Sequence, residues 1–486
     1  MYHDKYTGQY INGQWKSGSQ KDSLKVTNPY NHEILTEISL ANIQDLDEAY
    51  QAAAKAQKEW AAKSSSERAQ ILINVTQVMD KHHDEIVDVL IRESGSTRMK
   101  AEMEFSATRA CTFAAAMLSH QVTGKIIQGD TPDKESRVYR SAKGVIGIIS
   151  PWNWPLHLSN RSIAPAIALG NSVVVKPAED TPITGGLLLA SLYEEAGLPA
   201  GILNVVVGKS SEIGDAFTLH NIPKLISFTG STRIGRHIGQ LAMTGPSLKH
   251  VGLELGGNAP CVILDDANFD HAINAAVVGR FLHQGQICMS SNRIIVEQSL
   301  YPRFCEAFIE KVKTLKVGDP QDADTVIGPL INNKQVKAAT QRIQNAIAAG
   351  QHLALAGEIN EQIVSPHVFV NVDNQSELAQ TEQFAPIAPL ICARDEDHAL
   401  ALANQTEYGL ASAVFTENEA RGLRFAKQVQ AGMTHINDIT PNDDPYVMFG
   451  GEKNSGLGRF NSEWMISEFT TDHWISVQLK KRNYPF

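Results

Sequence analysis

The sequence contains few cysteines. Its 486 residues include five, an odd number without a CxxC pair: Cys111, Cys261, Cys288, Cys305 and Cys392. This pattern argues against a disulfide framework and favours free thiols in a reducing compartment. The 16 histidines show no HExxH motif and no Cys/His ligand spacing. We therefore expect no metal site.

Long hydrophobic runs and a surplus of positive charge are also missing. Apolar runs such as 145–149 and 172–175 are too short to cross a bilayer, and residues 1–20 lack the apolar centre of a secretory signal. The formal net charge is -10, and the basic cluster at 480–482 is explained at least as well by a solvated tail. We expect a cytoplasmic protein that binds neither nucleic acid nor a membrane.

The composition is that of a folded protein with more than one domain. Hydrophobic residues make up 43% and charged residues 20% of a chain of 486 residues, which is long enough for two or three cores. From Asp45 to His120 apolar residues recur at spacings of three and four, which predicts helix.

Short β-branched runs then alternate with helical segments. The runs are 144–150, 172–177, 203–208 and 225–230, and the helical segments between them include 181–196 and 211–219. This alternation predicts a doubly wound parallel sheet of the Rossmann-like α/β type, covered on both faces. Such sheets bind ligands at the carboxyl ends of their strands.

A second α/β series begins near Asn258. It has a predicted helix from Asn268 to about His283 and predicted strands at 261–266, 293–298, 367–372, 388–393 and 412–415. The β-prone segments 124–139 and 471–480 cannot form a core alone, and the second alternates like an edge strand, so we expect an arm that pairs with another subunit. The predicted parts are a cofactor domain (1–120 and 143–256), a catalytic domain (257–469) and an arm (121–142 and 470–486) in a homodimer or homotetramer.

Two motifs follow strands of the first series. In LISFTGSTRIG (225–235), Gly230 and Gly235 flank a turn where Ser231 and the helix N-terminus can hold a phosphate. The spacing is not GxGxxG, and taken alone an ordinary βα turn explains it better. In VVVKPAED (173–180), a strand ends in Lys176, and Glu179 follows three residues later. Glu179 can accept both ribose hydroxyls and repel a 2′-phosphate, although a solvated charge pair is the alternative.

Four further motifs carry reactive or polar groups. PWNWP places Asn153 where its amide can stabilise an oxyanion, although a structural turn is equally compatible. GLELGG places Glu254 in an apolar strand, where burial should raise the pKa of a general base. QGQICM contains Cys288, and its Gln and Gly residues favour an exposed loop over an inert core cysteine. TEQFAP offers Glu382 as a ribose acceptor and Phe384 as an aromatic platform.

These motifs together resemble the NAD(P)-dependent aldehyde dehydrogenase superfamily. PWNWP, KPAED, FTGSTRIG, LELGGN, QGQIC, EQFAP and FGGEKNSGLGR occur in the family's order between about Tyr10 and about Val477. The resemblance implies the aldehyde dehydrogenase fold: a Rossmann-like cofactor domain, a second α/β catalytic domain and an oligomerisation arm. It also implies NAD as the cofactor, with NADP possible.

The resemblance implies a role for each matching residue. Cys288 is the implied nucleophile, Asn153 and the Cys288 backbone N–H are the oxyanion donors, Glu254 is the base, and Glu463 is a second carboxylate on a proton path. The implied cofactor-binding residues are Trp152, Lys176, Glu179, Gly230, Ser231, Gly235, Glu382 and Phe384. Relatives that transfer the acyl group to coenzyme A generally lack the base, so Glu254 favours hydrolysis.

The substrate class is also indicated by resemblance. Residues 151–171 and 458–478 are similar to bacterial aromatic aldehyde dehydrogenases of the benzaldehyde and vanillin type. Where many relatives carry an aromatic residue this chain has Arg161, and we expect it, with Ile287, Met289 and Phe449, to shape a pocket for a ring bearing an oxygen substituent. A structural salt bridge of Arg161 is the alternative. Competing functions are an aliphatic or semialdehyde dehydrogenase and a non-catalytic relative. The latter would be expected to have lost one of the three main catalytic groups.

Overall fold

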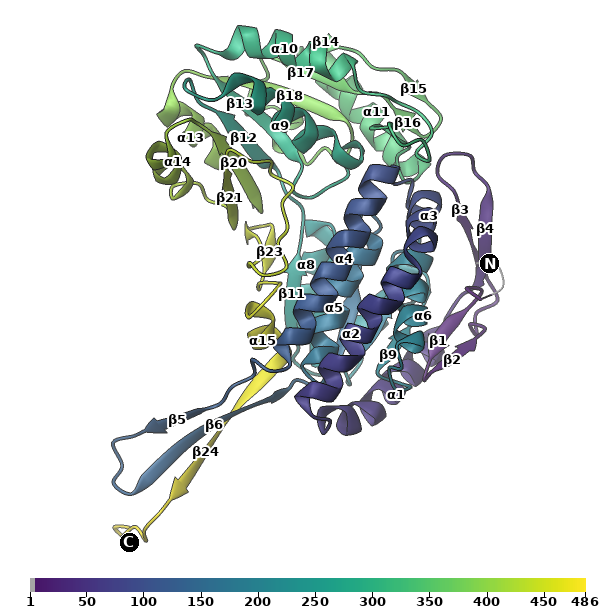
Figure 1. Ribbon diagram of the computed structural model, residues 1–486, viewed down its shortest axis with the longest axis vertical. Coiled ribbons are helices and arrows are strands. Elements are labelled where there is room, and N and C mark those ends of the chain that lie inside the picture. The colour runs from purple at the N-terminus through teal and green to yellow at the C-terminus, as the bar shows by residue number, and fades with distance from the viewer. Residues whose placement is uncertain (1–4) are drawn as a thin grey trace.

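Two α/β lobes and a projecting arm make up the protein (Figure 1). The computed structural model describes residues 5–486. The first lobe contains most of the N-terminal half of the chain, and the second lobe lies above it in Figure 1. The arm extends from the first lobe and carries the C-terminus at its tip.

The sheet of the first lobe has eight strands in the order β2-β1-β9-β8-β7-β10-β11-β23. Its five central strands are parallel, and the strands at its edges are antiparallel to their neighbours. All four β-branched runs of the first series are strands of this sheet, as predicted. The strands are β1 (Gln9–Ile11), β2 (Gln14–Lys16), β7 (Val145–Ile149), β8 (Ser172–Lys176), β9 (Leu203–Val205), β10 (Leu225–Thr229), β11 (His250–Glu254) and β23 (Gly456–Leu457).

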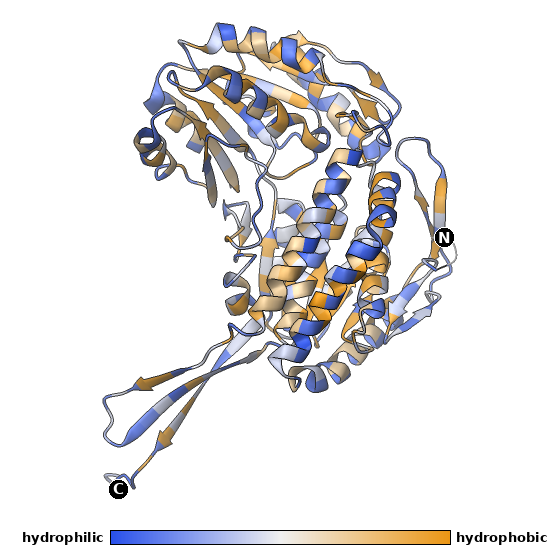
Figure 2. Cartoon of the chain, viewed as in Figure 1, coloured by the Kyte–Doolittle hydropathy of each residue, from blue (hydrophilic) through white to orange (hydrophobic). Residues whose placement is uncertain are grey.

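Two hydrophobic cores lie on opposite faces of this sheet. Val173 and Val175 of β8 belong to the core with helices α2 to α6, and Val174 belongs to the core with α1, α7 and α8. Because successive side chains of a strand point to opposite faces, a run that is apolar throughout needs helices on both. Figure 2 shows the hydrophobic residues concentrated along the strands. The helices are α1 (Ile43–Ala61), α2 (Ser65–Lys81), α3 (His83–Ser94), α4 (Arg98–Leu118), α5 (Pro155–Ala168), the π-helical turn η1 (Ile183–Leu187), α6 (Leu188–Glu195), α7 (Ser210–Leu219) and α8 (Thr232–Thr244).

Capping residues divide the region predicted as helical from Asp45 to His120 into four helices. Capping boxes begin α1 at Asn42 and α2 at Ser64. Gly95, with φ 66°, ends α3 in the left-handed conformation, and the Thr97 side chain caps α4. Periodicity therefore predicted the helical region, whereas capping chemistry marks the breaks before α2 and α4, and α3 begins without a side-chain cap.

The second lobe is built on a seven-stranded sheet in the order β14-β17-β18-β13-β12-β20-β21. Only β14 is antiparallel to its neighbour among these strands. The five strands predicted for the second series are all present, and the helix predicted from Asn268 is α9. The strands are β12 (Ala259–Ile263), β13 (Ser291–Glu297), β14 (His352–Leu355), β17 (His367–Val370), β18 (Ile387–Ala393), β20 (Ala411–Phe415) and β21 (Met433–Ile436). The helices are α9 (Phe269–Phe281), the short 3-10 turn η2 (Leu282–Gly285), α10 (Tyr301–Lys313), α11 (Asn333–Ala348), α12 (Glu377–Gln380), α13 (Glu396–Asn404) and α14 (Glu419–Ala426).

The arm is a three-stranded antiparallel sheet in the order β24-β6-β5. Its strands are β5 (Lys125–Gln128), β6 (Lys134–Ala142) and β24 (Thr470–Gln478). The two segments predicted as parts of an arm therefore pair with each other, from Thr470 opposite Ala142 to Gln478 opposite Lys134. β24 lies at the edge of this sheet, as its alternating pattern predicted.

The end of the predicted catalytic range returns to the first lobe. β23 joins the first sheet beside β11, and Phe449, Phe460 and Met465 belong to its core. The range 257–469 is thus not confined to one sheet. The remaining elements are the two-stranded sheets of β3 (Ser23–Thr27) with β4 (Ile34–Ser39), β15 (Ile359–Asn360) with β16 (Ile363–Val364) and β19 (Tyr408–Gly409) with β22 (Glu452–Lys453), and helix α15 (Trp464–Phe469). Within residues 5–486, no helix is both long and apolar enough to span a membrane.

Candidate active site

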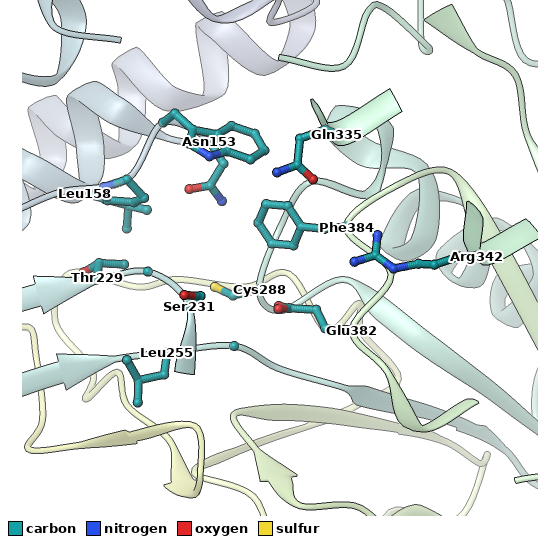
Figure 3. A pocket seen from close by; sticks show the side chains of 14 residues that line it. Asn153, Leu158, Thr229, Ser231, Leu255, Cys288, Gln335, Arg342, Glu382 and Phe384 are labelled. Atoms are coloured by element: carbon teal, nitrogen blue, oxygen red, sulfur yellow. The ribbon is translucent and has the colours of Figure 1, made fainter. Parts of the chain in front are cut away.

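A cavity of about 250 Å³ lies between the two lobes, beyond the carboxyl ends of β7, β10 and β11. This is the end of a doubly wound sheet at which ligands bind. Seven of the residues predicted from the sequence line it, and Figure 3 shows them around the sulfur of Cys288. The full lining is Pro151, Trp152, Asn153, Leu158, Thr229, Gly230, Ser231, Leu255, Gly256, Cys288, Gln335, Arg342, Glu382 and Phe384.

Cys288 lies on a strained loop after η2. The three residues His283, Gln284 and Gly285 all adopt the left-handed conformation, with φ of 50°, 57° and 73°. Residues with side chains rarely adopt this conformation, and it persists only where the surroundings hold it.

The glutamines of this loop are buried anchors. Gln284 Nε2 donates a hydrogen bond to the Pro329 carbonyl (2.9 Å), and Gln286 Oε1 accepts one from the Ile331 N–H (3.2 Å). The expectation of an exposed loop is therefore wrong, although Cys288 itself is partly exposed to the cavity. Composition misled here because amide side chains can also satisfy buried backbone groups.

The Asn153 side chain links the first lobe to the cysteine loop. Its Nδ2 donates to the Gln286 carbonyl at 2.9 Å, and the residue is buried. In Figure 3 the Asn153 amide points into the cavity on the side of the Cys288 sulfur. An amide N–H in this position can stabilise the negative charge of an oxyanion on a carbon bonded to the Cys288 sulfur.

Two glycines let the chain after Glu254 approach both the nucleophile loop and Glu382. A Cβ on Gly257 would lie 2.1 Å from the Cys288 carbonyl oxygen, and a Cβ on Gly256 would lie 2.8 Å from Glu382 Oε2. Glu382 also accepts a hydrogen bond from the Gly257 N–H at 3.0 Å. The two glycines of the GLELGG motif thus leave room for the Cys288 backbone and for the Glu382 carboxylate.

Glu254 is a buried carboxyl at the end of β11. The residue is 2% exposed, and neither carboxyl oxygen has a hydrogen-bond partner among residues 5–486. Burial raises its pKa to about 8, with Arg161 and Arg459 lowering it and Asp443 raising it. The predicted rise of this pKa is confirmed in direction, and its cause is desolvation.

The Cys288 thiol is protonated at neutral pH in this environment. Burial raises its pKa to about 12, the charges of Glu382 and Glu254 raise it as well, and Arg161 lowers it. A nucleophilic thiolate at this position therefore needs a base to remove its proton or a cation to stabilise it.

The N-terminus of α8 faces the cavity through Gly230 and Ser231. Ser231 occupies the N-cap without capping the helix through its own side chain, so first-turn N–H groups remain for a ligand. Gly235 has a different role in this turn, because a Cβ there would lie 2.3 Å from the Leu255 side chain. It permits close packing of α8 on the segment after β11.

Lys176 and Glu179 meet at the start of α7 rather than forming a direct ion pair. Lys176 Nζ donates to Ser210 Oγ at 2.9 Å, and Glu179 Oε1 accepts from the Ser210 N–H at 2.7 Å. Lys176 is buried and Glu179 half-buried, so a fully solvated charge pair does not describe them. Lys176 is the last residue of β8, and Glu179 follows three residues beyond its carboxyl end.

Glu382 and Phe384 line the main cavity together with Arg342, a cation that no sequence motif indicated. Burial raises the pKa of Glu382 to about 7, while the Gly257 N–H, Arg342 and Arg280 lower it. Phe384, with φ 48°, contacts Trp152 edge to face at a ring distance of 5.4 Å. Arg342 and Gln335 come from α11, a polar helix in which no motif distinguished them.

Arg161 is buried behind the cavity. It is 1% exposed, its Nη1 lies 3.4 Å from Asp443 Oδ2, and its guanidinium stacks over the rings of Phe449 (4.2 Å) and Phe460 (5.1 Å). The salt bridge named as the alternative is therefore present. Arg161 Nε nevertheless has no hydrogen-bond partner among the described residues.

Asp443 and Phe449 also border a second cavity of about 370 Å³. Its other lining residues are Gly432, Met433, Thr434, His435, Asn442, Asp444, Val447 and Met448. Asp443 accepts hydrogen bonds from His157 and Asn461 as well, and these contacts with Arg161 lower its pKa to about 2 despite burial.

Three other predicted site residues lie away from the lining of the main cavity. Ile287 is buried in the loop before Cys288, and Met289 after it is half-buried. Glu463 is exposed at the N-terminus of α15, and no hydrogen bond or ion pair of the described residues joins it to Glu254. Its position on a proton path stays a prediction.

Comparison with known proteins identifies the family of this site. The aldehyde dehydrogenase family matches residues 15–475. A vanillin dehydrogenase of Corynebacterium glutamicum is 50% identical over 472 residues, covering 97% of this chain and 98% of the relative. A benzaldehyde dehydrogenase of Bacillus subtilis is 46% identical over 478 residues, covering 98% of each chain.

Solved structures agree with the fold. The crystal structure of an NAD-dependent benzaldehyde dehydrogenase from Corynebacterium glutamicum superposes with a TM-score of 0.91 and 46% sequence identity. The match covers 99% of this chain and 98% of that one. The predicted fold class, a Rossmann-like domain with a second α/β domain and an arm, is confirmed.

Proposed function

Since this chain belongs to the aldehyde dehydrogenase family, we propose that it oxidises an aromatic aldehyde to the carboxylic acid through a covalent intermediate on Cys288. The enzyme is an NAD(P)-dependent aldehyde dehydrogenase. The observation that carries the proposal is one cavity lined by the partly exposed Cys288 thiol, the Asn153 amide and the open N-terminus of α8.

The cavity fits NAD, the family's cofactor. The α8 N-terminus at Gly230 and Ser231 offers N–H donors to a pyrophosphate. Glu179 at the end of β8 can accept the ribose hydroxyls, with Lys176 beside it, and Glu382 can accept those of the nicotinamide ribose. Trp152 and Phe384 supply aromatic surface. When bound, NAD supplies the acceptor for the hydride that leaves the aldehyde carbon.

Cys288 forms the bond to the substrate. A base removes the thiol proton, and the resulting thiolate adds to the aldehyde carbon, which converts the carbonyl oxygen into an oxyanion. Asn153 Nδ2 and the Cys288 N–H donate hydrogen bonds to that oxyanion. Loss of hydride from the same carbon re-forms the carbonyl and leaves a thioester on Cys288.

Glu254 completes the reaction. Its carboxylate takes a proton from water, the hydroxyl oxygen bonds to the thioester carbon, and the carbon–sulfur bond breaks to release the acid and the Cys288 thiolate. A pKa of about 8 gives this carboxyl a basicity suited to catalysis in slightly alkaline solution. The same carboxylate can take the Cys288 proton in the first step, and it then releases that proton to solvent before it deprotonates water.

The aromatic substrate class rests on the relatives. Two relatives of this chain, at 50% and 46% identity, are named for vanillin and benzaldehyde. We infer that the aldehyde ring lies near Ile287, Met289, Phe449 and the Arg161 guanidinium, with the second cavity as its approach. Phe449 links these regions because it both stacks on Arg161 and borders that cavity.

The decisive test is an initial-rate assay of NADH formation at pH 8. Benzaldehyde, vanillin, hexanal and succinic semialdehyde are compared with NAD and with NADP, for wild type and Cys288→Ala. We expect the aromatic aldehydes with NAD to give the highest kcat/KM, and Cys288→Ala to lose at least about 10⁴-fold in kcat because no covalent intermediate forms.

The possible outcomes separate mechanism from substrate. Faster turnover of hexanal or succinic semialdehyde would keep the mechanism and replace the aromatic assignment with an aliphatic one. Activity that survives in Cys288→Ala would contradict the nucleophile. Cys305→Ala is the matched control, since Cys305 is half-buried on α10 and outside the cavity.

A further inference from the structure

α4 contains a buried ion pair that faces the start of α5. Lys100 and Glu104 are both fully buried, and Nζ lies 2.5 Å from Oε2. Lys100 Nζ also donates to Ser96 Oγ at 2.9 Å and lies 4.8 Å from the ring centre of Trp154. Burying two charges is costly unless they make further hydrogen bonds.

Glu104 makes such bonds to the backbone of α5. Its Oε1 accepts from the Leu156 N–H at 2.9 Å and from the His157 N–H at 3.2 Å. α5 has no side-chain cap of its own, because its N-cap residue is Trp154 and its first residue is Pro155. A carboxylate from the neighbouring helix thus caps α5, where the helix dipole favours negative charge. Figure 1 shows α4 and α5 side by side.

The segment held by this pair begins with Asn153. Trp154, over which the Lys100 cation lies, is the next residue, and the Asn153 amide binds the Gln286 carbonyl of the cysteine loop. The same cation acts on His283 of that loop: burial lowers the pKa of His283, and the Lys100 charge lowers it further, so the imidazole is neutral. The Lys100 charge therefore acts both on the residue after the oxyanion donor and on the nucleophile loop.

We propose that Lys100 and Glu104 are positioning residues for the Asn153 amide. Glu104 fixes the first turn of α5, Lys100 neutralises Glu104 and supports Trp154, and together they hold Asn153 where an oxyanion on Cys288 develops. This inference rests on the proposed function of Asn153. An error of about 1 Å in such a donor is enough to lower the rate by about two orders of magnitude.

The test compares two charge-neutral double variants. Lys100→Met/Glu104→Gln keeps a carbonyl acceptor for the α5 N–H groups, whereas Lys100→Met/Glu104→Ala removes it. We expect the Ala variant to lose about 10- to 100-fold in kcat with KM for NAD and aldehyde changed less than about threefold, and the Gln variant to recover most of that loss. Glu104→Asp keeps the charge but has a shorter side chain, so it should also lower kcat. It replaces the Ala variant in the test if that variant does not fold.

A double-mutant cycle with Asn153→Ala separates positioning from general stability. In the Asn153→Ala background the difference between the Gln and Ala variants should shrink to about twofold or less. An equal difference in both backgrounds would overturn the proposal, as would an Asn153→Ala enzyme with wild-type kcat. Thr112→Val is the matched control, because it removes another buried hydrogen bond between α4 and α5, from Asn160 (2.6 Å), further along the two helices.

A measurement independent of turnover distinguishes this proposal from the proposed function. Hydrogen exchange of the Leu156 and His157 amides should be faster in the Lys100→Met/Glu104→Ala variant than in wild type and in Thr112→Val. Unchanged protection would overturn the capping role even in an active enzyme. If exchange is faster in this variant but the wild-type protein oxidises no aldehyde, Glu104 does cap α5, and only its proposed role in catalysis is refuted.

Discussion

Glu254 is buried, and burial disfavours its ionised form relative to its protonated form. Its folded-state pKa of about 8 exceeds the ordinary value of 4.5 because of burial. Between these two pH values the folded protein binds a proton that the unfolded chain has released, so this group makes stability fall as pH rises. A base with this basicity is thus obtained at the expense of stability.

Glu254→Gln should separate stability from activity. We expect the Tm of the variant, relative to wild type, to increase between pH 5 and pH 8.5, because the amide has no charge to desolvate. kcat should fall at least about 100-fold, because thioester hydrolysis lacks its base. Calorimetry at several pH values and steady-state kinetics check both effects. Glu306→Gln, which alters an exposed carboxyl on α10, is the control. If the Tm difference between Glu254→Gln and wild type did not change with pH, Glu254 would not be a buried group that titrates in this range.

Arg161 forms an ion pair with Asp443, and we propose that it also contacts the substrate. If it binds an oxygen substituent on the ring, Arg161→Met should lower kcat/KM for 4-hydroxybenzaldehyde about tenfold more than for benzaldehyde. Asp443→Asn keeps the cation and weakens the ion pair, so it should affect both substrates alike. Equal losses in Arg161→Met would assign this residue to the ion pair alone.

At the scale of elements, the end of β8 and the start of α7 form one unit. Glu179 caps Ser210 of α7 with a half-buried carboxylate, which fixes its orientation beside Lys176. A carboxylate held in this way has a fixed orientation for the ribose contact that we propose. The sequence indicated both residues, but only the folded chain shows that Ser210, more than 30 residues later, holds them.

Replacing this carboxylate should change cofactor selectivity. In Glu179→Ser the repulsion of a 2′-phosphate is removed, so we expect the ratio of kcat/KM for NADP to that for NAD to rise about tenfold or more. The rates with each cofactor at fixed benzaldehyde measure it. Glu212→Gln, in the first turn of α7, controls for loss of any negative charge there, and an equal change in both variants would refute a specific role of Glu179.

At the scale of the whole molecule, the arm exposes hydrophobic residues to solvent. Ile126 is 76% exposed, Trp474 63% and Ile475 41%, on a sheet that packs on no core of its own. Exposed apolar surface on a projecting, open-edged sheet is typical of a subunit contact. We therefore retain the prediction of a homodimer or homotetramer assembled through the arm.

Ile126→Glu/Trp474→Glu should weaken that assembly. We expect the wild-type protein to sediment as a dimer or tetramer and the variant as a smaller species, because burying two carboxylates in an apolar contact is unfavourable. Analytical ultracentrifugation between 1 and 50 μM checks this. Val447→Glu, an exposed apolar site outside the arm, is the control. A monomeric wild type would contradict the role of the arm.

The sequence alone predicted the elements and the chemistry that each segment carries locally. The alternation of β-branched runs with helices identified the sheets, and PWNWP, LELGG and QGQIC identified Asn153, Glu254 and Cys288. These signals are local, since the periodicity of burial and the residues after a strand are properties of neighbouring positions.

Tertiary structure decided how distant groups meet. The capping of α5 by Glu104, the pairing of Arg161 with Asp443 and the placing of Arg342 beside Glu382 join segments that no spacing relates. The same holds for β23, which lies in the predicted catalytic range but joins the sheet of the first lobe. It also holds for Gln284 and Gln286, whose side chains were expected to be exposed but form buried hydrogen bonds. Each depends on which buried polar groups the packed chain must satisfy, and that requirement exists only after the lobes have packed together.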